Sequence, residues 1–149
     1  MSTETPTDGP TQNEMIGLIR ERWPDGVTAE IEGAIFFSLD EKHWPNFATI
    51  VWQDDFDEGA VSKLTERPGV YRVNVGVDQE AFARLVGGAA DPDYAAIDRF
   101  LPHPVYARQR WISILNPSHA TVREELLALI EAAHDRLAAQ RKRQRPIER

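Results

Sequence analysis

The chain has 149 residues, of which 42% are apolar and 28% are charged. This length and balance predict one folded domain and exclude a chain that is disordered overall. The net charge is −7, and the absence of cysteine excludes disulfides, thiolate metal sites and thiol catalysis. No apolar run approaches the ~20 residues that a membrane helix needs, so we expect no membrane contact and a cytoplasmic location.

Charge is distributed unevenly along the chain. From Arg136 to Arg149, six basic residues outnumber one acid, so the rest of the chain is strongly acidic. We expect a flexible tail at 1–10, an α+β domain at 11–138 and a basic tail at 139–149. The basic tail is either a solvated helix end, where cations suit the helix dipole, or a contact for polyanions. In the second case the nucleic-acid-binding residues are Arg141, Lys142, Arg143 and Arg145.

The first third of the chain predicts a helix followed by three strands. Thr11 and Glu14 have the spacing of a capping box, and apolar residues then recur at helical spacing as far as about Arg22. The sequence around Pro24 turns the chain. The expected strands are Val27–Ile31, Ala34–Leu39 and Phe47–Trp52, and the last two form an antiparallel hairpin.

The middle of the chain contains the clearest strand, which runs from Pro68 to Val77 after a short helix expected near 59–65. Alternate residues divide between its two faces. Tyr71, Val73, Val75 and Val77 share one face, and Arg72, Asn74 and Gly76 share the other. Asp78 then caps a helix that ends at two glycines.

The last third predicts a short helix at 91–101, an extended stretch and a strand at Trp111–Leu115. Pro102 and Pro104 force the stretch that follows them to be extended. A final helix runs from about Thr121 into the basic tail. The fold class is therefore α+β: a single domain with an antiparallel sheet of about four or five strands and flanking helices on one side.

The strand at 68–77, the segment at 101–106, the strand at 111–117 and the closing helix resemble an uncharacterised actinobacterial family of the domain-of-unknown-function kind. That resemblance covers roughly 13–137 and implies no activity. A more distant likeness is to the MmcQ/YjbR-like family, through the strand leading into an Asp-started helix, the Trp-led strand at 110–114 and the helix containing Glu125. The likeness implies a compact α+β fold and a proposed role in DNA binding. The long loop at 87–106 and the acidic body depart from that pattern.

Arg72 and Asn74 lie two residues apart on one strand, so they project from the same face. If that face is open, they form a paired site for a carboxylate, phosphate or amide. If it is covered, Arg72 pairs with a nearby acid and Asn74 satisfies a loop backbone. We expect His103, Tyr106 and Asn116 to form the rim of the site.

His103 lies between two prolines, which fix its position. An imidazole held in this way suits a general base or a ligand donor, and it also suits a backbone hydrogen bond inside a packed loop. An orienting acid would be needed for catalysis, and Asp98 is a candidate only through its proximity in sequence.

Cofactor and metal motifs do not occur. The histidines lack metal-site spacing, and there is no phosphate-binding loop, dinucleotide fingerprint or nucleophile elbow. We therefore predict no metal and no cofactor. The leading hypothesis is a non-enzymatic binding module for a small polar ligand or protein partner. The alternatives are a nucleic-acid-binding protein and a hydrolase or transferase that uses His103. We expect a monomer or homodimer.

Overall fold

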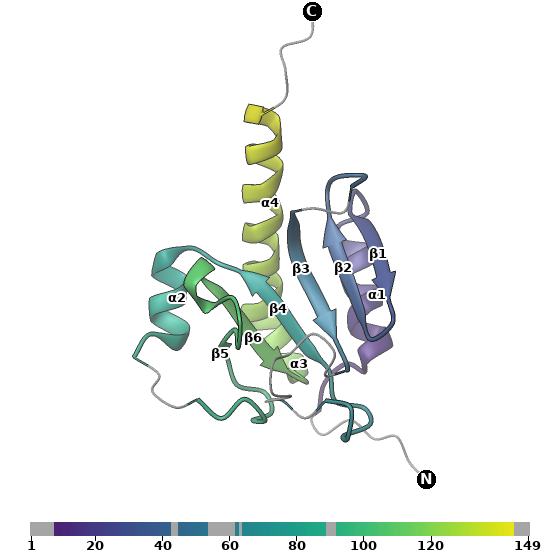
Figure 1. The fold of residues 1–149 in the computed structure, drawn as a ribbon, viewed down its shortest axis with the longest axis vertical. Coiled ribbons are helices and arrows are strands. Elements are labelled where there is room, and N and C mark those ends of the chain that lie inside the picture. The colour runs from purple at the N-terminus through teal and green to yellow at the C-terminus, as the bar shows by residue number, and fades with distance from the viewer. Residues whose placement is uncertain (1–7, 43–44, 54–61, 63, 89–91, 145–149) are drawn as a thin grey trace, which may run out of the picture.

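The computed structural model describes residues 8–42, 45–53, 62, 64–88 and 92–144 (Figure 1). Its strands are β1 (Val27–Ile31), β2 (Ala34–Ser38), β3 (Asn46–Val51), β4 (Arg72–Gly76), β5 (Leu101–Pro102) and β6 (Trp111–Leu115). Its helices are α1 (Gln12–Arg22), α2 (Gln79–Val86), α3 (His119–Thr121) and α4 (Leu127–Gln144), with a 3-10 turn η3 (Ala107–Gln109) and a π-helical turn η4 (Val122–Leu126).

The strands form one antiparallel sheet in the order β1-β2-β3-β4-β6-β5. The predicted single-domain α+β fold with an antiparallel sheet is confirmed, and the described residues form six strands. The additional strand is β5, which has only two residues and ends at Pro102. The stretch after the prolines was expected to be extended, but residues 104–110 are turns and the 3-10 turn η3, because the chain reverses there to pair β5 with β6. The pairing of β5 with β6 places the loop between them at one edge of the sheet.

One face of the sheet is covered by helices. Residues 35, 37, 48, 50, 73, 75, 112 and 114 form the core with the buried sides of α1 and α4. Both helices lie behind the strands in Figure 1, and α4 extends well beyond the sheet. The predicted capping box starts α1, where the Glu14 N–H donates to Thr11 Oγ1 at 3.2 Å and the Thr11 N–H donates to Glu14 Oε1 at 2.8 Å.

The opposite face is covered by irregular segments. A second, smaller core forms there, in which Leu64, Val70, Tyr94 and Ile97 pack against strand residues of β2, β3, β5 and β6. Apolar side chains therefore bury both faces of the central strands. The face that carries Arg72 and Asn74 lies under this second layer.

The predicted helix at 91–101 is wrong, because residues 92–100 are turns and extended chain. Ile97 forms a parallel bridge with Leu115, and the Asp98 N–H donates to the Leu115 carbonyl at 2.7 Å. Asp98 has a φ of 56°, which no right-handed helix contains. Apolar residues at helical spacing thus pack on the sheet as extended chain. The helix expected near 59–65 lies mostly outside the described residues.

The closing helical region begins slightly earlier than expected. Ser118 is the N-cap of α3, so the helix starts at His119 and passes through η4 into α4. The helix continues to Gln144, so the described part of the predicted basic tail at 139–149 is helical. Within the ranges that the structure describes, no helix is long and apolar enough to cross a membrane.

Asn116 joins the end of β6 to the start of β4. Its Oδ1 accepts the Tyr71 N–H at 3.0 Å, and its Nδ2 donates to the Gly69 carbonyl at 2.9 Å. Its side chain is fully buried and its φ is 39°, a conformation that asparagine tolerates better than most residues. The Tyr71 hydroxyl in turn donates to the Pro10 carbonyl at 2.8 Å, so this junction also anchors the chain before α1.

We predict that Asn116→Ala lowers the free energy of unfolding by about 2–3 kcal/mol, because the buried Tyr71 N–H and the Gly69 carbonyl lose their partners. Urea denaturation measures the change. Asn13→Ala, on the exposed side of α1, is the matched control and should shift stability by less than about 0.5 kcal/mol. Equal losses in the two variants would contradict the structural role of Asn116.

Candidate functional site

The polar residues of β4 lie in register with polar residues of the two neighbouring strands. Asn74 pairs with Thr49 of β3 on one side and with Ser113 of β6 on the other. Side chains that are directly opposite in an antiparallel sheet share a face. The three residues therefore form a polar row across the middle of the sheet, on the face that lacks helices.

Asn74 is the centre of this row. Its Nδ2 donates to Thr49 Oγ1 at 2.9 Å, and its Oδ1 accepts the Ser113 hydroxyl at 2.7 Å. The same Oδ1 accepts Arg72 Nε at 3.0 Å. One amide side chain thus bonds to three strands and uses both its donor and its acceptor in doing so.

Arg72 is almost completely enclosed, with only 1% of its surface exposed. In addition to its bond with Asn74, its Nη1 donates to Ser62 Oγ at 3.2 Å, which joins the row to the covering segment. An Arg72/Asn74 pair open to a ligand was one of the two expectations from the sequence. The structure instead shows a covered pair, whose polar atoms are used within the protein. Asn74 bonds to side chains and not to a loop backbone.

His103 follows β5 and is also buried, with 5% of its surface exposed. Its Nδ1 accepts the N–H groups of Val105 and Tyr106, both at 3.0 Å. Burial, and secondly the nearby charge of Arg72, lowers the pKa of His103 to about 3. At neutral pH the ring is therefore uncharged, and Nδ1 remains a hydrogen-bond acceptor.

This arrangement gives little support to His103 as a general base. Its Nδ1 already accepts hydrogen bonds from two backbone N–H groups, and a group with so low a pKa is a weak base at neutral pH. Asp98, considered as its orienting acid, instead accepts the Ser118 N–H at 2.9 Å. The contacts of His103 are those of a residue that shapes a loop.

The loop that His103 shapes is here called the hairpin tip and consists of residues 104–110. Tyr106 lies on it with 53% of its surface exposed, and its ring centroid is 5.0 Å from that of His103. Val105 is 42% exposed. The turn η3 and the bond from the Val77 N–H to the Arg110 carbonyl, at 2.9 Å, close the tip against the end of β4.

The five predicted ligand residues therefore lie in different surroundings. Arg72 and Asn74 belong to the buried polar row, and Asn116 belongs to the buried junction of β4 and β6. His103 lies beneath the hairpin tip, and only Tyr106 is open to solvent. The structure brings together Arg72 with Asn74, and His103 with Tyr106, but it does not form one open pocket from all five.

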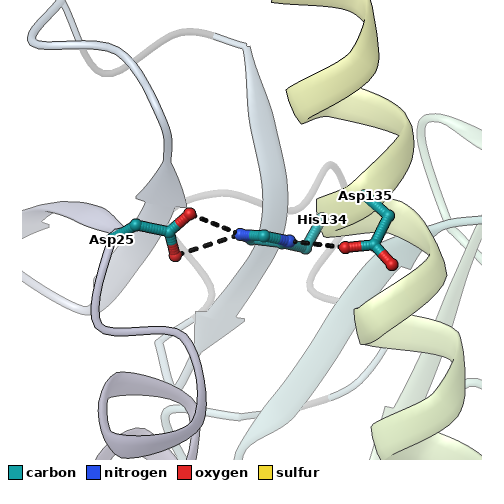
Figure 2. A network of polar contacts seen from close by, with 3 residues as sticks. All are labelled: Asp25, His134 and Asp135. Carbon is teal, nitrogen blue, oxygen red and sulfur yellow. Dashed lines mark hydrogen bonds and ion pairs between the residues drawn. The ribbon is translucent and has the colours of Figure 1, made fainter.

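A second polar cluster was not predicted from the sequence. Figure 2 shows His134 of α4 between two carboxylates, with Nε2 2.8 Å from Asp25 Oδ2 and Nδ1 3.0 Å from Asp135 Oδ1. Its ring also packs edge-on against Phe47, at a centroid distance of 5.2 Å. Asp25 is 109 residues away along the chain, so no local spacing could have revealed this contact.

The two carboxylates favour the charged form of His134. Burial alone lowers the pKa of His134, but the hydrogen bonds and charges of Asp135 and Asp25 together outweigh burial and raise it. The resulting ion pairs hold the turn after α1 against α4. Since both ring nitrogens are bonded to carboxylates and neither partner is a serine, threonine or cysteine, the cluster has a structural geometry and not that of a catalytic triad.

The predicted nucleic-acid residues are only partly described. Arg141 forms an ion pair with Asp40 of the β2–β3 loop, at 2.6 Å between Nη1 and Oδ2, and Lys142 is exposed. The side chain of Arg143 and all of Arg145 lie outside the described residues. Among the described residues, no group of three or more histidines and carboxylates is arranged to hold a metal ion.

Comparison with known proteins identifies a family. Residues 10–146 match the family model described as a family of unknown function (DUF6194). The chain belongs to this family. No curated protein and no solved structure matches the chain. For this DUF6194 chain, the properties of the site therefore follow from its own residues.

We predict that Arg72→Ala lowers the free energy of unfolding by more than about 3 kcal/mol, because it leaves a cavity in place of a long buried side chain and removes a hydrogen-bond donor from Asn74 and from Ser62. Chemical denaturation provides the measurement. Arg20→Ala, at an exposed position on α1, should have an effect below about 0.5 kcal/mol. A stable Arg72→Ala protein would contradict the view that this arginine supports the fold.

We predict a pH-dependent contribution from His134. Because its pKa is raised in the folded state, the stabilisation is fully present below the unfolded pKa and is lost as pH rises through the folded pKa. The stability difference between wild type and His134→Gln should therefore be largest in mild acid and should shrink at alkaline pH. Denaturation at a series of pH values tests this. His119→Gln, at an exposed histidine, is the control and should change stability by less than about 0.5 kcal/mol.

Proposed function

We propose that this DUF6194 protein is a non-enzymatic binding module that takes a protein partner at the hairpin tip. The observation that carries the proposal is the exposure of Val105 and Tyr106. Among the described residues, the large apolar side chains that are most exposed are Ile31, Val105 and Tyr106. Two of these three are adjacent on the same loop, and neighbouring exposed apolar side chains mark interaction surfaces more than isolated ones do.

The hairpin tip is held in one conformation before any partner arrives. The Gln109 N–H donates to the Tyr106 carbonyl at 3.0 Å, the Arg110 N–H donates to the Ala107 carbonyl at 2.9 Å, and His103 binds the first two N–H groups of the loop. A loop that is already ordered loses less conformational entropy on binding. Tyrosine adds a large, stiff side chain of the kind that often dominates interface energies.

In this proposal the five predicted site residues have different roles. Tyr106 contacts the partner, and His103 positions it. Arg72, Asn74 and Asn116 support the frame from within. The small-polar-ligand version of the proposal needs the segment over Arg72 to move aside, because Arg72 and Asn74 are each 1% exposed.

Fewer observations support the nucleic-acid alternative than support a protein partner. The exposed Lys142 and the more distant MmcQ/YjbR-like likeness favour it, whereas the net charge of −7 and the pairing of Arg141 with Asp40 oppose it. The hydrolase alternative depends on His103, whose low pKa gives it little basic strength at neutral pH. A cytoplasmic location, an actinobacterial origin and a monomeric or homodimeric state are parts of the same proposal.

We predict that selection from a random peptide display library on the immobilised protein enriches peptides whose binding is lost in Tyr106→Ser. The substitution removes an exposed aromatic contact, so folding should be unaffected, and the thermal midpoint checks this. Tyr94→Ser is unsuitable as a control because Tyr94 packs in the second core. Ile31→Ser, an exposed apolar residue at the far edge of the sheet, should retain binding.

Two results would contradict the proposal. Selection that enriches no peptide would argue against a protein partner at this surface. Peptides that bind wild type and Tyr106→Ser equally would place the contact elsewhere. In either case a thermal-shift panel of polar metabolites would then test the small-ligand version, with a stabilising compound as its supporting result.

A further inference from the structure

We infer that the partner segment bound at the hairpin tip is acidic, and that Arg108 and Arg110 recognise its carboxylates. This inference rests on the proposed function, since it names the chemistry of the partner at the same surface. It assigns a specificity role to two residues that the sequence analysis did not single out.

Along the chain, the residues around the tip carry a charge opposite in sign to that of the whole protein. The 25 residues from 99 to 123 contain four arginines and no carboxylate, although the chain as a whole carries −7. Two of these arginines, Arg108 and Arg110, lie on the tip within four residues of Tyr106. The only exposed aromatic ring of the tip therefore has two cationic neighbours along a short, ordered turn.

Both guanidinium groups are available to a partner. Arg108 and Arg110 are exposed, and neither forms an ion pair or side-chain hydrogen bond with any described residue. In contrast, Arg84 pairs with Glu125 and Arg141 pairs with Asp40. A free guanidinium presents a planar set of donors that matches a carboxylate with two parallel hydrogen bonds.

The backbone at both arginines is fixed. Arg108 lies in η3, and Arg110 has a φ of 62°. The Arg110 carbonyl accepts the Val77 N–H at 2.9 Å, and the Trp111 N–H donates to the Tyr106 carbonyl at 3.2 Å. The side chains of Arg108, Arg110 and Tyr106 thus extend from one hydrogen-bonded turn. This favours selective recognition because fewer groups have to be ordered on binding.

A short acidic peptide fits this surface better than a nucleic acid does. The bond from Val77 to Arg110 places the tip next to the start of α2, where Asp78 and Glu80 are exposed. Their charges repel a polyanion that continues past the tip, whereas a short peptide can end before reaching them. Nucleic-acid binding also draws on many phosphate contacts, and the tip offers two cations.

The test uses two fluorescent synthetic peptides that differ only in charge. One contains glutamates around a central leucine, and the other has glutamine in place of each glutamate. Fluorescence anisotropy measures their affinities for the full chain, for Tyr106→Ser, for Arg108→Gln/Arg110→Gln and for Arg20→Gln/Arg123→Gln. The last variant removes the same charge from exposed arginines that lie off the tip. Single-stranded oligothymidine serves as a competitor.

We expect the acidic peptide to bind wild type about fivefold to tenfold more tightly than its glutamine twin, as two exposed ion pairs allow. Arg108→Gln/Arg110→Gln should remove that preference, and Arg20→Gln/Arg123→Gln should keep it. The preference should fall as salt is added. Circular dichroism confirms that each variant is folded.

Four results would overturn the inference. Equal affinity for both peptides that still depends on Tyr106 would remove the acidic preference but leave the proposed binding surface standing. Equal loss of preference in both double variants would show a general charge effect. Competition by oligothymidine that depends on Arg108 and Arg110 would assign the tip to nucleic acid. Failure of both peptides to bind also overturns the inference, and the library selection then decides separately whether the surface binds peptides at all.

Discussion

The hydrogen bonds of Asn74 are the interaction on which the rest of this fold depends. One buried amide joins β3, β4 and β6, and its oxygen also accepts a hydrogen bond from the guanidinium of Arg72. Buried polar groups are costly unless each is satisfied, so this row requires a single register of the three strands. A slip of one residue would move every partner to the other face. The polar row thus specifies the sheet as well as stabilising it.

The buried charge of Arg72 influences the exposed hairpin tip through His103. Burial and the positive field of Arg72 keep that imidazole neutral, so its Nδ1 can accept the two N–H groups that begin the hairpin tip. The exposed Tyr106 is therefore supported by a chain of interactions that starts inside the sheet. A loop anchored in this way can present a binding surface without ordering itself first. This connection explains why polar residues that are closed to solvent can still matter for recognition.

The sequence predicted much of the fold because the relevant signals are local. Thr11 and Glu14 predicted the start of α1, and the alternation from Tyr71 to Val77 divided β4 correctly between its faces. The helical spacing of apolar residues at 91–101 led to a wrong prediction of a helix, because Ile97 packs against Leu115 as extended chain. The spacing of apolar residues shows which side chains could share a face of a helix. Packing against the sheet decided that this segment is extended. The contact of His134 with Asp25 had no local signal at all.

For this chain, the sequence by itself determined the fold class, most of the element boundaries and the fact that Arg72 and Asn74 share a face. Only the tertiary structure decided that this face is covered, because its burial comes from distant residues such as Leu64 and Tyr94. It also decided that Tyr106 is exposed while His103, three residues earlier, is buried. The physical reason is that helix caps and strand alternation depend on neighbours along the chain, whereas access to a side chain depends on which distant segments pack over it.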